Sequence, residues 1–184
     1  MTTPRLVILD RDGVINEDAE GEYVKSAEEW IPLPGSLEAI ARLNRAGHRV
    51  VIASNQSGLA RGYFDIEALN GIHEKMQRLL AETGGGIDAI FFCPHSPRQR
   101  CECRKPKPGL LGQIAQRYRV DLSRVPVVGD KRADLEAARA AGAQPFLVRT
   151  GYGEKTLRAL GDFDGVTVYS DLAAFTDAWL AKPE

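Results

Sequence analysis

Short apolar runs alternate with longer amphipathic stretches along this chain. The apolar runs cover residues 6–9, 50–53, 87–92, 126–128, 146–148 and 166–169, and several are apolar at every position. Such runs predict parallel strands that are buried on both faces of a sheet. We therefore expect an α/β protein with three layers, in which helices cover both faces of a Rossmann-like parallel sheet.

The amphipathic stretches predict five helices between and after these strands, and their ends carry capping signals. Ser36 can cap a helix that runs to residue 46, and Asp65 can cap one that runs to residue 82. Pro108 fits the first turn of a third helix, which ends near residue 118. A fourth helix is expected over residues 133–141 and a last one after Ser170.

Three polar or Gly- and Pro-rich segments follow predicted strands, at residues 14–34, 56–64 and 93–106. In a parallel sheet such loops gather at the carboxyl ends of the strands, where ligands bind. Any binding site is therefore expected at this edge of the sheet.

Length and charge exclude several classes of protein. The 184 residues suit one domain over 1–184, and a net charge of −1 with a pI near 6.3 excludes a broad basic surface for nucleic acid. The first apolar run is too short for a membrane span or a signal peptide, so we expect a cytoplasmic protein without a membrane partner. Little apolar surplus is left over, and a monomer is expected.

Carboxylates follow two of the predicted strands. Asp10 and Asp12 end the first, with Gly13 allowing a turn, and Asp130 and Asp134 follow the strand at 126–128. An Asp-Gly pair alone would also fit a surface turn. Two strands that are each followed by aspartates together predict a site for a hard cation. Room for waters and phosphate oxygens favours Mg²⁺.

Phosphate-binding groups lie between these acidic motifs in the sequence. Ser54 ends the second strand, and Lys105 lies in a basic stretch that begins at Arg104. A hydroxyl and an ammonium group can orient and neutralise a phosphoryl group.

Three cysteines and a histidine crowd into one loop, over residues 93–105. Cys93, His95, Cys101 and Cys103 offer four ligands in the combination that zinc prefers. With all four positions filled by protein, the metal would be structural. The alternative is three unrelated reduced cysteines beside a surface histidine.

The four ordered motifs at Asp10, Ser54, Lys105 and Asp130 resemble the haloacid dehalogenase superfamily of phosphohydrolases. The resemblance implies that Asp10 is the nucleophile that forms an aspartyl-phosphate, and that Asp12 is the general acid and base. It also implies Mg²⁺ ligation by Asp10, Asp130 and the backbone carbonyl of Asp12. Asp134 would support the metal or Lys105.

The spacing of the motifs leaves no room for an inserted cap domain, so the loops must select the substrate. The Cys-Pro-His and Cys-Glu-Cys-Arg-Lys-Pro loop with an Asp-Arg-Asp-Gly start resembles the heptose-1,7-bisphosphate 7-phosphatase family, whose members serve lipopolysaccharide or surface-layer glycan synthesis. That resemblance implies a small phosphorylated sugar as substrate. The residues it implies in substrate binding are Asp18, Tyr23, Ser54, Asn55, Gln56, Ser57, Arg104 and Lys105.

Other interpretations stay open at this point. Lys131 can touch substrate or pair with a carboxylate. A histidinol-phosphate phosphatase shares the capless core and zinc loop, although Arg61, Arg104 and Lys107 favour a doubly anionic substrate. A zinc-stabilised binding protein without activity is a further alternative. His48 and His73 are expected to be surface or boundary residues.

Overall fold

A six-stranded parallel sheet forms the centre of the molecule, within the residues that the computed structural model describes: 5–19, 21–160 and 165–182. The strand order is β3-β2-β1-β4-β5-β6, the order of Rossmann sheets. The strands are β1 (Leu6–Leu9), β2 (Arg49–Asn55), β3 (Ala89–Cys93), β4 (Pro126–Gly129), β5 (Gln144–Val148) and β6 (Thr167–Tyr169). The predicted fold class is confirmed.

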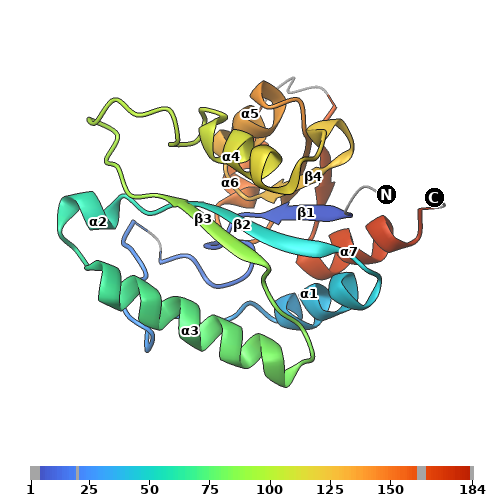
Figure 1. The fold of residues 1–184 in the computed structure, drawn as a ribbon, viewed down its shortest axis with the longest axis horizontal. Coiled ribbons are helices and arrows are strands. Elements are labelled where there is room, and N and C mark those ends of the chain that lie inside the picture. Colours follow the sequence, from blue (N-terminus) through green and yellow to red (C-terminus); the bar gives the residue numbers. More distant parts are fainter. Residues whose placement is uncertain (1–4, 20, 161–164, 183–184) are drawn as a thin grey trace.

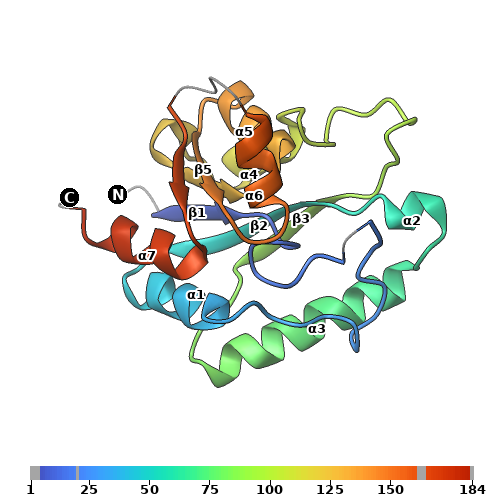
Figure 2. The same cartoon turned by 180° about the vertical axis from the view of Figure 1, so that it is seen from behind.

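Helices cover both faces of this sheet (Figures 1 and 2). One face carries α1 (Ser36–Arg45), α3 (Ile66–Glu82) and α7 (Leu172–Leu180), and the other carries α4 (Gly109–Tyr118) and α5 (Arg132–Ala140). The side chains of β1 alternate between the two cores: Val7 and Leu9 face α1, while Leu6 and Ile8 face α4. This double burial explains why β1 has no polar position.

Some predicted helix ends are confirmed and others are wrong. Asp65 caps α3, since its side chain accepts a hydrogen bond from the Ala68 N–H. Ser36 does not cap α1: Gly35 takes that position with φ near +74°, and the Ser36 hydroxyl donates to the Ile15 carbonyl at 2.6 Å. Pro108 is the cap residue before α4 and not part of its first turn.

Three short elements go beyond what the sequence predicts: α2 (Gly58–Arg61), α6 (Gly153–Ala159) and the 3-10 helix η1 (Leu122–Arg124). The helix α2 lies inside a segment that the sequence predicts as a loop. None of the helices in the described part of the chain is both long and apolar enough to cross a bilayer.

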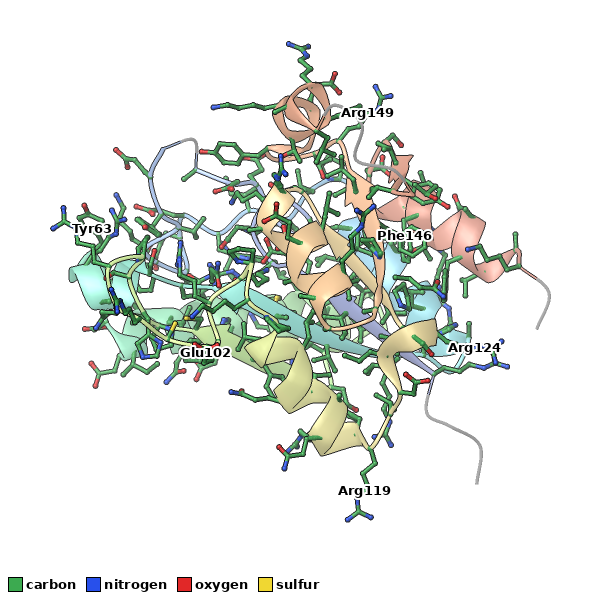
Figure 3. All side chains as sticks on the ribbon, turned by 90° about the horizontal axis from the view of Figure 1, so that it is seen from above. Tyr63, Glu102, Arg119, Arg124, Phe146 and Arg149 are labelled. Atoms are coloured by element: carbon green, nitrogen blue, oxygen red, sulfur yellow. The ribbon has the colours of Figure 1, made fainter. Side chains whose placement is uncertain are left out.

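The topology brings the ends of β1 and β4 together at the middle of the sheet. These strands are neighbours although β2 and β3 come between them in the sequence, and this reversal of strand order creates a crevice at their carboxyl ends. Figure 3 shows Tyr63 and Glu102 at the end of the molecule where the loops gather, and Arg124, just before β4, at the opposite end. The carboxylates that follow β1 and β4 lie at the loop end.

Candidate active site

Three buried carboxylates meet where β1 and β4 end. Asp10 follows β1, and its N–H donates to the Val128 carbonyl of β4 at 2.9 Å. Asp130 follows β4, and Asp134 lies in the first turn of α5. One oxygen from each of the three carboxylates lies within 4.8 Å of the others. The sequence therefore located this cluster correctly from the positions of the strands.

Two glycines make room for the Asp130 carboxylate. Gly13 has a φ of +83°, and a Cβ there would come within 2.1 Å of the Asp130 Oδ2 atom. A Cβ on Gly151 would come within 2.3 Å of the same oxygen. Any larger residue at either position would therefore displace the carboxylate.

Lys105 neutralises part of this acidic cluster. Its ammonium group lies 3.0 Å from Asp10 Oδ1 and 2.5 Å from Asp134 Oδ1, and it also donates to the Ala53 carbonyl at 2.6 Å. Burial disfavours the charge, but the two carboxylates outweigh burial and raise the pKa of Lys105 above its ordinary value. Lys105 is therefore a permanent cation beside Asp10.

The cluster still carries unbalanced negative charge. Burial, only partly offset by Lys105, raises the pKa of Asp10 to about 6. Burial also raises the pKa of Asp130 well above its usual value. Two buried carboxylates that resist ionisation favour a cation between them.

Asp130 has an open oxygen. Its Oδ2 accepts from the Tyr152 N–H at 2.8 Å, but the buried Oδ1 has no hydrogen-bond partner within the part of the chain that the structure describes. Both Asp134 oxygens are engaged, by Lys105 and by the Lys131 N–H. Buried polar atoms are normally satisfied, so the donor set fits a hard cation on Asp10 and Asp130.

Asp12 lies in a different environment from Asp10. Its side chain is 17% exposed and lines the pocket. Burial raises its pKa, but Arg11 and hydrogen bonds from Asn16 and Gln56 outweigh that effect, and the pKa of Asp12 is lowered. Relative to a free aspartate, the environment of Asp10 thus favours the neutral form and that of Asp12 favours the charged form.

A pocket of about 660 Å³ meets this site at Asp12 and Lys105. Most of the predicted substrate residues line it: Asp18, Tyr23, Asn55, Ser57, Arg104, Lys105 and Lys131. Ser54 and Gln56 are buried instead, and the Gln56 amide donates to Ser54 Oγ at 2.8 Å and to Asp12 at 3.0 Å. These two residues connect the floor of the pocket to Asp12.

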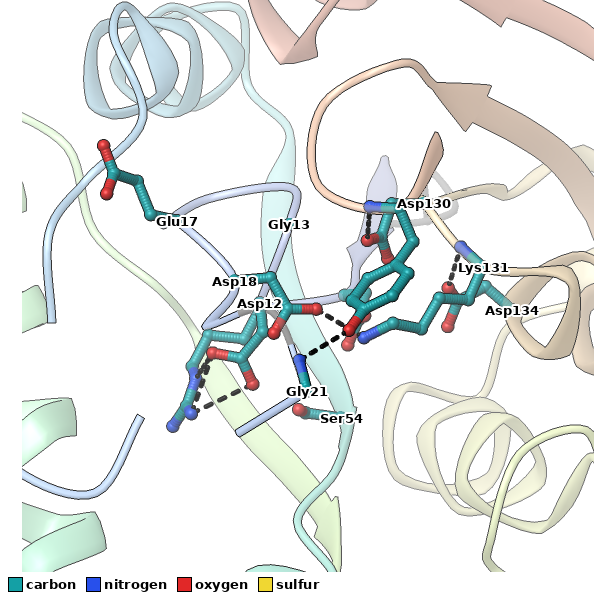
Figure 4. Close-up of polar contacts among 12 residues, drawn as sticks. Asp12, Gly13, Glu17, Asp18, Gly21, Ser54, Asp130, Lys131 and Asp134 are labelled. Atoms are coloured by element: carbon teal, nitrogen blue, oxygen red, sulfur yellow. Dashed lines mark hydrogen bonds and ion pairs between the residues drawn. The ribbon is translucent and has the colours of Figure 1, made fainter. Parts of the chain in front are cut away.

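One wall of the pocket is formed by contacts between distant loops (Figure 4). The Lys131 ammonium pairs with Asp18 at 2.6 Å and lies 4.7 Å from the centre of the Tyr152 ring. The Gly21 N–H donates to the Tyr152 hydroxyl at 3.0 Å. Lys131 thus pairs with a carboxylate, which was one of its two expected roles, and it also faces the pocket.

The sequence did not single out Tyr152, Tyr63 or Arg11. Tyr152 and Tyr63 line the pocket, and Tyr63 is 55% exposed. Arg11 is buried against Asp12. For Tyr152, the sequence offered one signal of a functional position: the flanking Gly151 and Gly153, because glycines mark close backbone approaches.

The cysteine loop forms a second compact cluster. The Cys93 and Cys103 sulfurs are 3.2 Å apart, and the His95 Nδ1 lies 3.3 Å from the Cys103 sulfur. Cys101 lies 3.8 Å from Cys93. Burial raises the pKa of the Cys93 thiol to about 12. Four ligand atoms that converge on one centre fit a tetrahedral metal.

A Rossmann-like sheet with aspartates after adjacent strands, a buried lysine beside them and an open pocket defines a hydrolase of the haloacid dehalogenase type. A family model described as HAD-hydrolase-like matches residues 102–175. The chain is 57% identical to D-glycero-β-D-manno-heptose-1,7-bisphosphate 7-phosphatase of Bordetella bronchiseptica, over 97% of this chain and 99% of that protein. It is 53% identical to the enzyme of the same name from Pseudomonas aeruginosa, over 95% and 97% of the two chains.

Solved structures agree with these sequence relationships. The crystal structure of the B. bronchiseptica D,D-heptose 1,7-bisphosphate phosphatase, complexed with magnesium and phosphate, matches with a TM-score of 0.93 over 96% of this chain and 98% of that one. The phosphatase from Burkholderia thailandensis matches with a TM-score of 0.77 at 48% identity, over 97% and 99% of the two chains. The chain therefore belongs to the heptose-1,7-bisphosphate 7-phosphatase family, as its motifs predicted.

Proposed function

We propose that this chain removes the 7-phosphate of D-glycero-β-D-manno-heptose 1,7-bisphosphate in a Mg²⁺-dependent hydrolysis. The observation that carries the proposal is the 57% identity to a phosphatase of this name over nearly the full length of both chains. The aligned length includes the loops that line the pocket. The β anomer is chosen because the relatives from B. bronchiseptica and P. aeruginosa both bear that name.

Asp10 is proposed as the nucleophile. A carboxylate repels a phosphate dianion, so the attack requires positive charge at the reacting group. Lys105 supplies one charge 3.0 Å from Asp10 Oδ1. Attack of the other Asp10 oxygen on phosphorus forms an aspartyl-phosphate and breaks the bond to the O7 atom of the sugar.

Asp12 is proposed as the acid and base. It protonates the leaving O7 atom, and it then takes a proton from the water that attacks the aspartyl-phosphate, which releases inorganic phosphate and regenerates Asp10. Its lowered pKa suits the second step. For the first step Asp12 must carry a proton, which the negative charge of a bound phosphate favours.

Mg²⁺ fits the carboxylate cluster, with Asp10, Asp130 and the Asp12 backbone carbonyl as proposed ligands. When bound, it would offset the negative charge of the phosphoryl group and of the carboxylates. The open Asp130 Oδ1 supports this assignment. Asp134 then has the task of holding Lys105 in place.

Zn²⁺ fits the cluster of Cys93, His95, Cys101 and Cys103, in a structural role. The loop carries Arg104 and Lys105 directly after its last ligand, and Arg104 also donates to the His95 carbonyl at 3.3 Å. A bound ion would hold these two cations at the pocket, because it would fix the loop on both sides.

Substrate contacts are proposed for the predicted residues that line or underlie the pocket, with Ser54 orienting the transferring phosphoryl group. Arg104, Lys105 and Lys131 supply cations for a substrate that carries two phosphates, while Asp18, Tyr23, Asn55, Gln56 and Ser57 supply polar groups for its hydroxyls. Such a substrate cannot cross a membrane unaided, which supports a cytoplasmic enzyme. Every proposed group comes from one chain, which supports activity as a monomer.

The test compares kcat/KM for the β and α anomers of the heptose bisphosphate and for histidinol phosphate, with and without Mg²⁺. The proposal expects the β anomer to be preferred and the 1-phosphate to stay on the product. A preference for histidinol phosphate, or release of the 1-phosphate, would reject it.

A further inference from the structure

Arg11 is a buried cation that the proposed mechanism does not use. It lies between Asp10 and Asp12 in the sequence, and its exposed fraction is 0%. An arginine without contact with water destabilises a fold unless its charge is paired and its donors are satisfied. The position of its guanidinium group therefore needs an explanation.

The guanidinium group donates hydrogen bonds to the Asp12 carboxylate from one side. Its Nε donates to Asp12 Oδ1 at 3.1 Å, and its Nη2 donates to both Oδ1 and Oδ2 at 3.0 Å. Asn16 and Gln56 donate to the same two oxygens at 2.9 and 3.0 Å. The carboxylate orientation is thus fixed by three side chains from two segments, the loop after β1 and the loop after β2, and Arg11 supplies the charge among them.

His73 holds the other end of the guanidinium group. The Nη1 atom of Arg11 lies 3.3 Å from His73 Nε2. Arginine only donates hydrogen bonds, so His73 Nε2 is the acceptor and the imidazole is neutral. Burial and the charge of Arg11 lower the pKa of His73 to about 4, in agreement with that form. His73 belongs to α3 and is half-buried, so it is a boundary residue as the sequence predicts, and its imidazole faces inward to Arg11.

We propose that Arg11, held by His73, is a positioning residue that fixes the Asp12 carboxylate for both of its proton transfers. The inference rests on the proposed role of Asp12. A carboxylate that rotates freely would meet the leaving oxygen and the attacking water in poor geometry, and a misplaced catalytic group lowers the rate strongly.

The two chemical steps depend on Asp12 to different extents with an aryl phosphate. Because p-nitrophenolate leaves as a stable anion, formation of the aspartyl-phosphate needs no proton from Asp12. Hydrolysis of the aspartyl-phosphate still needs the base. Loss of positioning should therefore slow only the second step with this substrate, whereas a general distortion of the site would slow both.

The experiment is stopped-flow release of p-nitrophenolate by the Mg²⁺-loaded protein carrying Arg11→Met. We expect a burst of one p-nitrophenolate per active site, at close to the rate of the unmodified protein. The steady-state rate that follows should be about 100-fold lower than that of the unmodified protein, which is the size of a typical acid–base contribution. The ratio of burst rate to steady-state rate is the readout. If both rates fall together, or if neither changes, the proposal is wrong.

Two further variants keep the test decisive. His73→Phe retains Arg11 but removes its acceptor, and we expect a burst with an approximately tenfold slower steady state. This variant carries the test if Arg11→Met does not fold, and an absent burst then overturns the proposal. Lys75→Met is the matched control, because it removes a cation from the same helix, where Lys75 donates to the Ala27 and Trp30 carbonyls. Its burst and steady-state rates should match those of the unmodified protein.

The readout also separates this inference from the proposed function. If the protein hydrolyses the aryl phosphate but not the heptose bisphosphate, the substrate proposal fails while the burst kinetics still decide the role of Arg11.

Discussion

The two clusters of candidate metal ligands in this protein are assembled in opposite ways. The carboxylates of Asp10, Asp130 and Asp134 come from distant parts of the sequence and meet because β1 pairs with β4. The cysteine cluster comes from eleven consecutive residues, from Cys93 at the end of β3 to Cys103 in the loop that follows. The carboxylate site depends on the order of the strands in the sheet, whereas the cysteine site needs only one strand end and the loop after it.

The two clusters also differ in their chemistry. The carboxylate cluster includes a cation, Lys105, and an oxygen of Asp130 without a partner in the described structure, so it can share a metal with a ligand. The cysteine cluster turns all four ligand atoms toward each other, so no position is left for a substrate. The first arrangement suits chemistry and the second suits stability, and four changes test this contrast.

Replacement of Asp10 should have the largest effect. Asp10→Asn removes the nucleophile, and we expect kcat on the heptose bisphosphate to fall about ten-thousandfold. The free energy of unfolding without metal should be unchanged or higher, because a buried carboxylate with a raised pKa is removed while Lys105 keeps Asp134. Steady-state kinetics and urea unfolding measure the two effects.

Asp65→Asn is the matched control for that substitution, since Asn also caps helices well. Its activity and stability should both stay close to those of the unmodified protein. Residual turnover of Asp10→Asn within about tenfold of the unmodified protein would remove Asp10 from the nucleophile's role.

Loss of one cysteine ligand of the proposed zinc site should lower the stability of the protein and not its activity. Cys103→Ser weakens zinc binding, and a thousandfold loss of affinity at fixed free zinc lowers the free energy of unfolding by about 4 kcal/mol. With excess zinc keeping the weakened site occupied, we expect kcat at saturating Mg²⁺ to change less than about threefold. The ion then still fixes the loop, and Lys105 is also held by Asp10, Asp134 and the Ala53 carbonyl. Elemental analysis measures the bound zinc, and thermal unfolding measures the loss of stability. If the unmodified protein is purified without bound zinc, the prediction is wrong.

The affinity for Mg²⁺ should depend on pH. The pKa of Asp10 is raised to about 6, so the carboxyl binds a proton as the pH falls through that value and the metal must displace it. From pH 7 to pH 5 we expect the affinity to fall about tenfold. Isothermal titration of Mg²⁺ at the two pH values measures the change, and equal affinities would show that Asp10 is not a ligand.

The smallest effect is expected at the edge of the carboxylate cluster. Tyr152→Phe keeps the backbone N–H that binds Asp130 but removes the hydroxyl that accepts from Gly21. One hydrogen bond of about 1 kcal/mol predicts a KM about fivefold higher with kcat unchanged. Tyr169→Phe, whose ring packs on Phe146 and Phe175, is the control. A fall in kcat without a change in KM would place Tyr152 in the chemistry.

The sequence predicted the parts of the molecule that depend on local pattern. The apolar run at 6–9 has the same bounds as β1 because both faces of that strand are buried. Asp10 and Asp130 could be grouped from the sequence, since each follows a predicted strand of the same parallel sheet. In contrast, α6 has only seven residues and no clear apolar period, and its buried Thr156 is held by a hydroxyl bond to the Asp130 carbonyl.

Long-range contacts explain what the sequence could not predict. Arg11 would suit an exposed turn by its residue type, and its burial depends on His73, which α3 brings from 62 positions away. Tyr152 reaches the pocket because its hydroxyl meets Gly21, 131 positions away in the sequence. No periodicity or motif around these residues predicts the contacts of Arg11 with His73 and of Tyr152 with Gly21. These contacts form only once the sheet has brought the segments together.

The central claim is that phosphate is transferred to Asp10 and then to water. Borohydride reduction of the protein during turnover tests this directly, because it converts an aspartyl-phosphate to homoserine. Asp12→Asn should be used with p-nitrophenyl phosphate as substrate. Formation of the intermediate then needs no proton from Asp12, while its hydrolysis is slowed and the intermediate accumulates. We predict homoserine at position 10 by peptide mass spectrometry, only when substrate is present. Substrate-dependent reduction at another carboxylate, or none at position 10, would contradict the account.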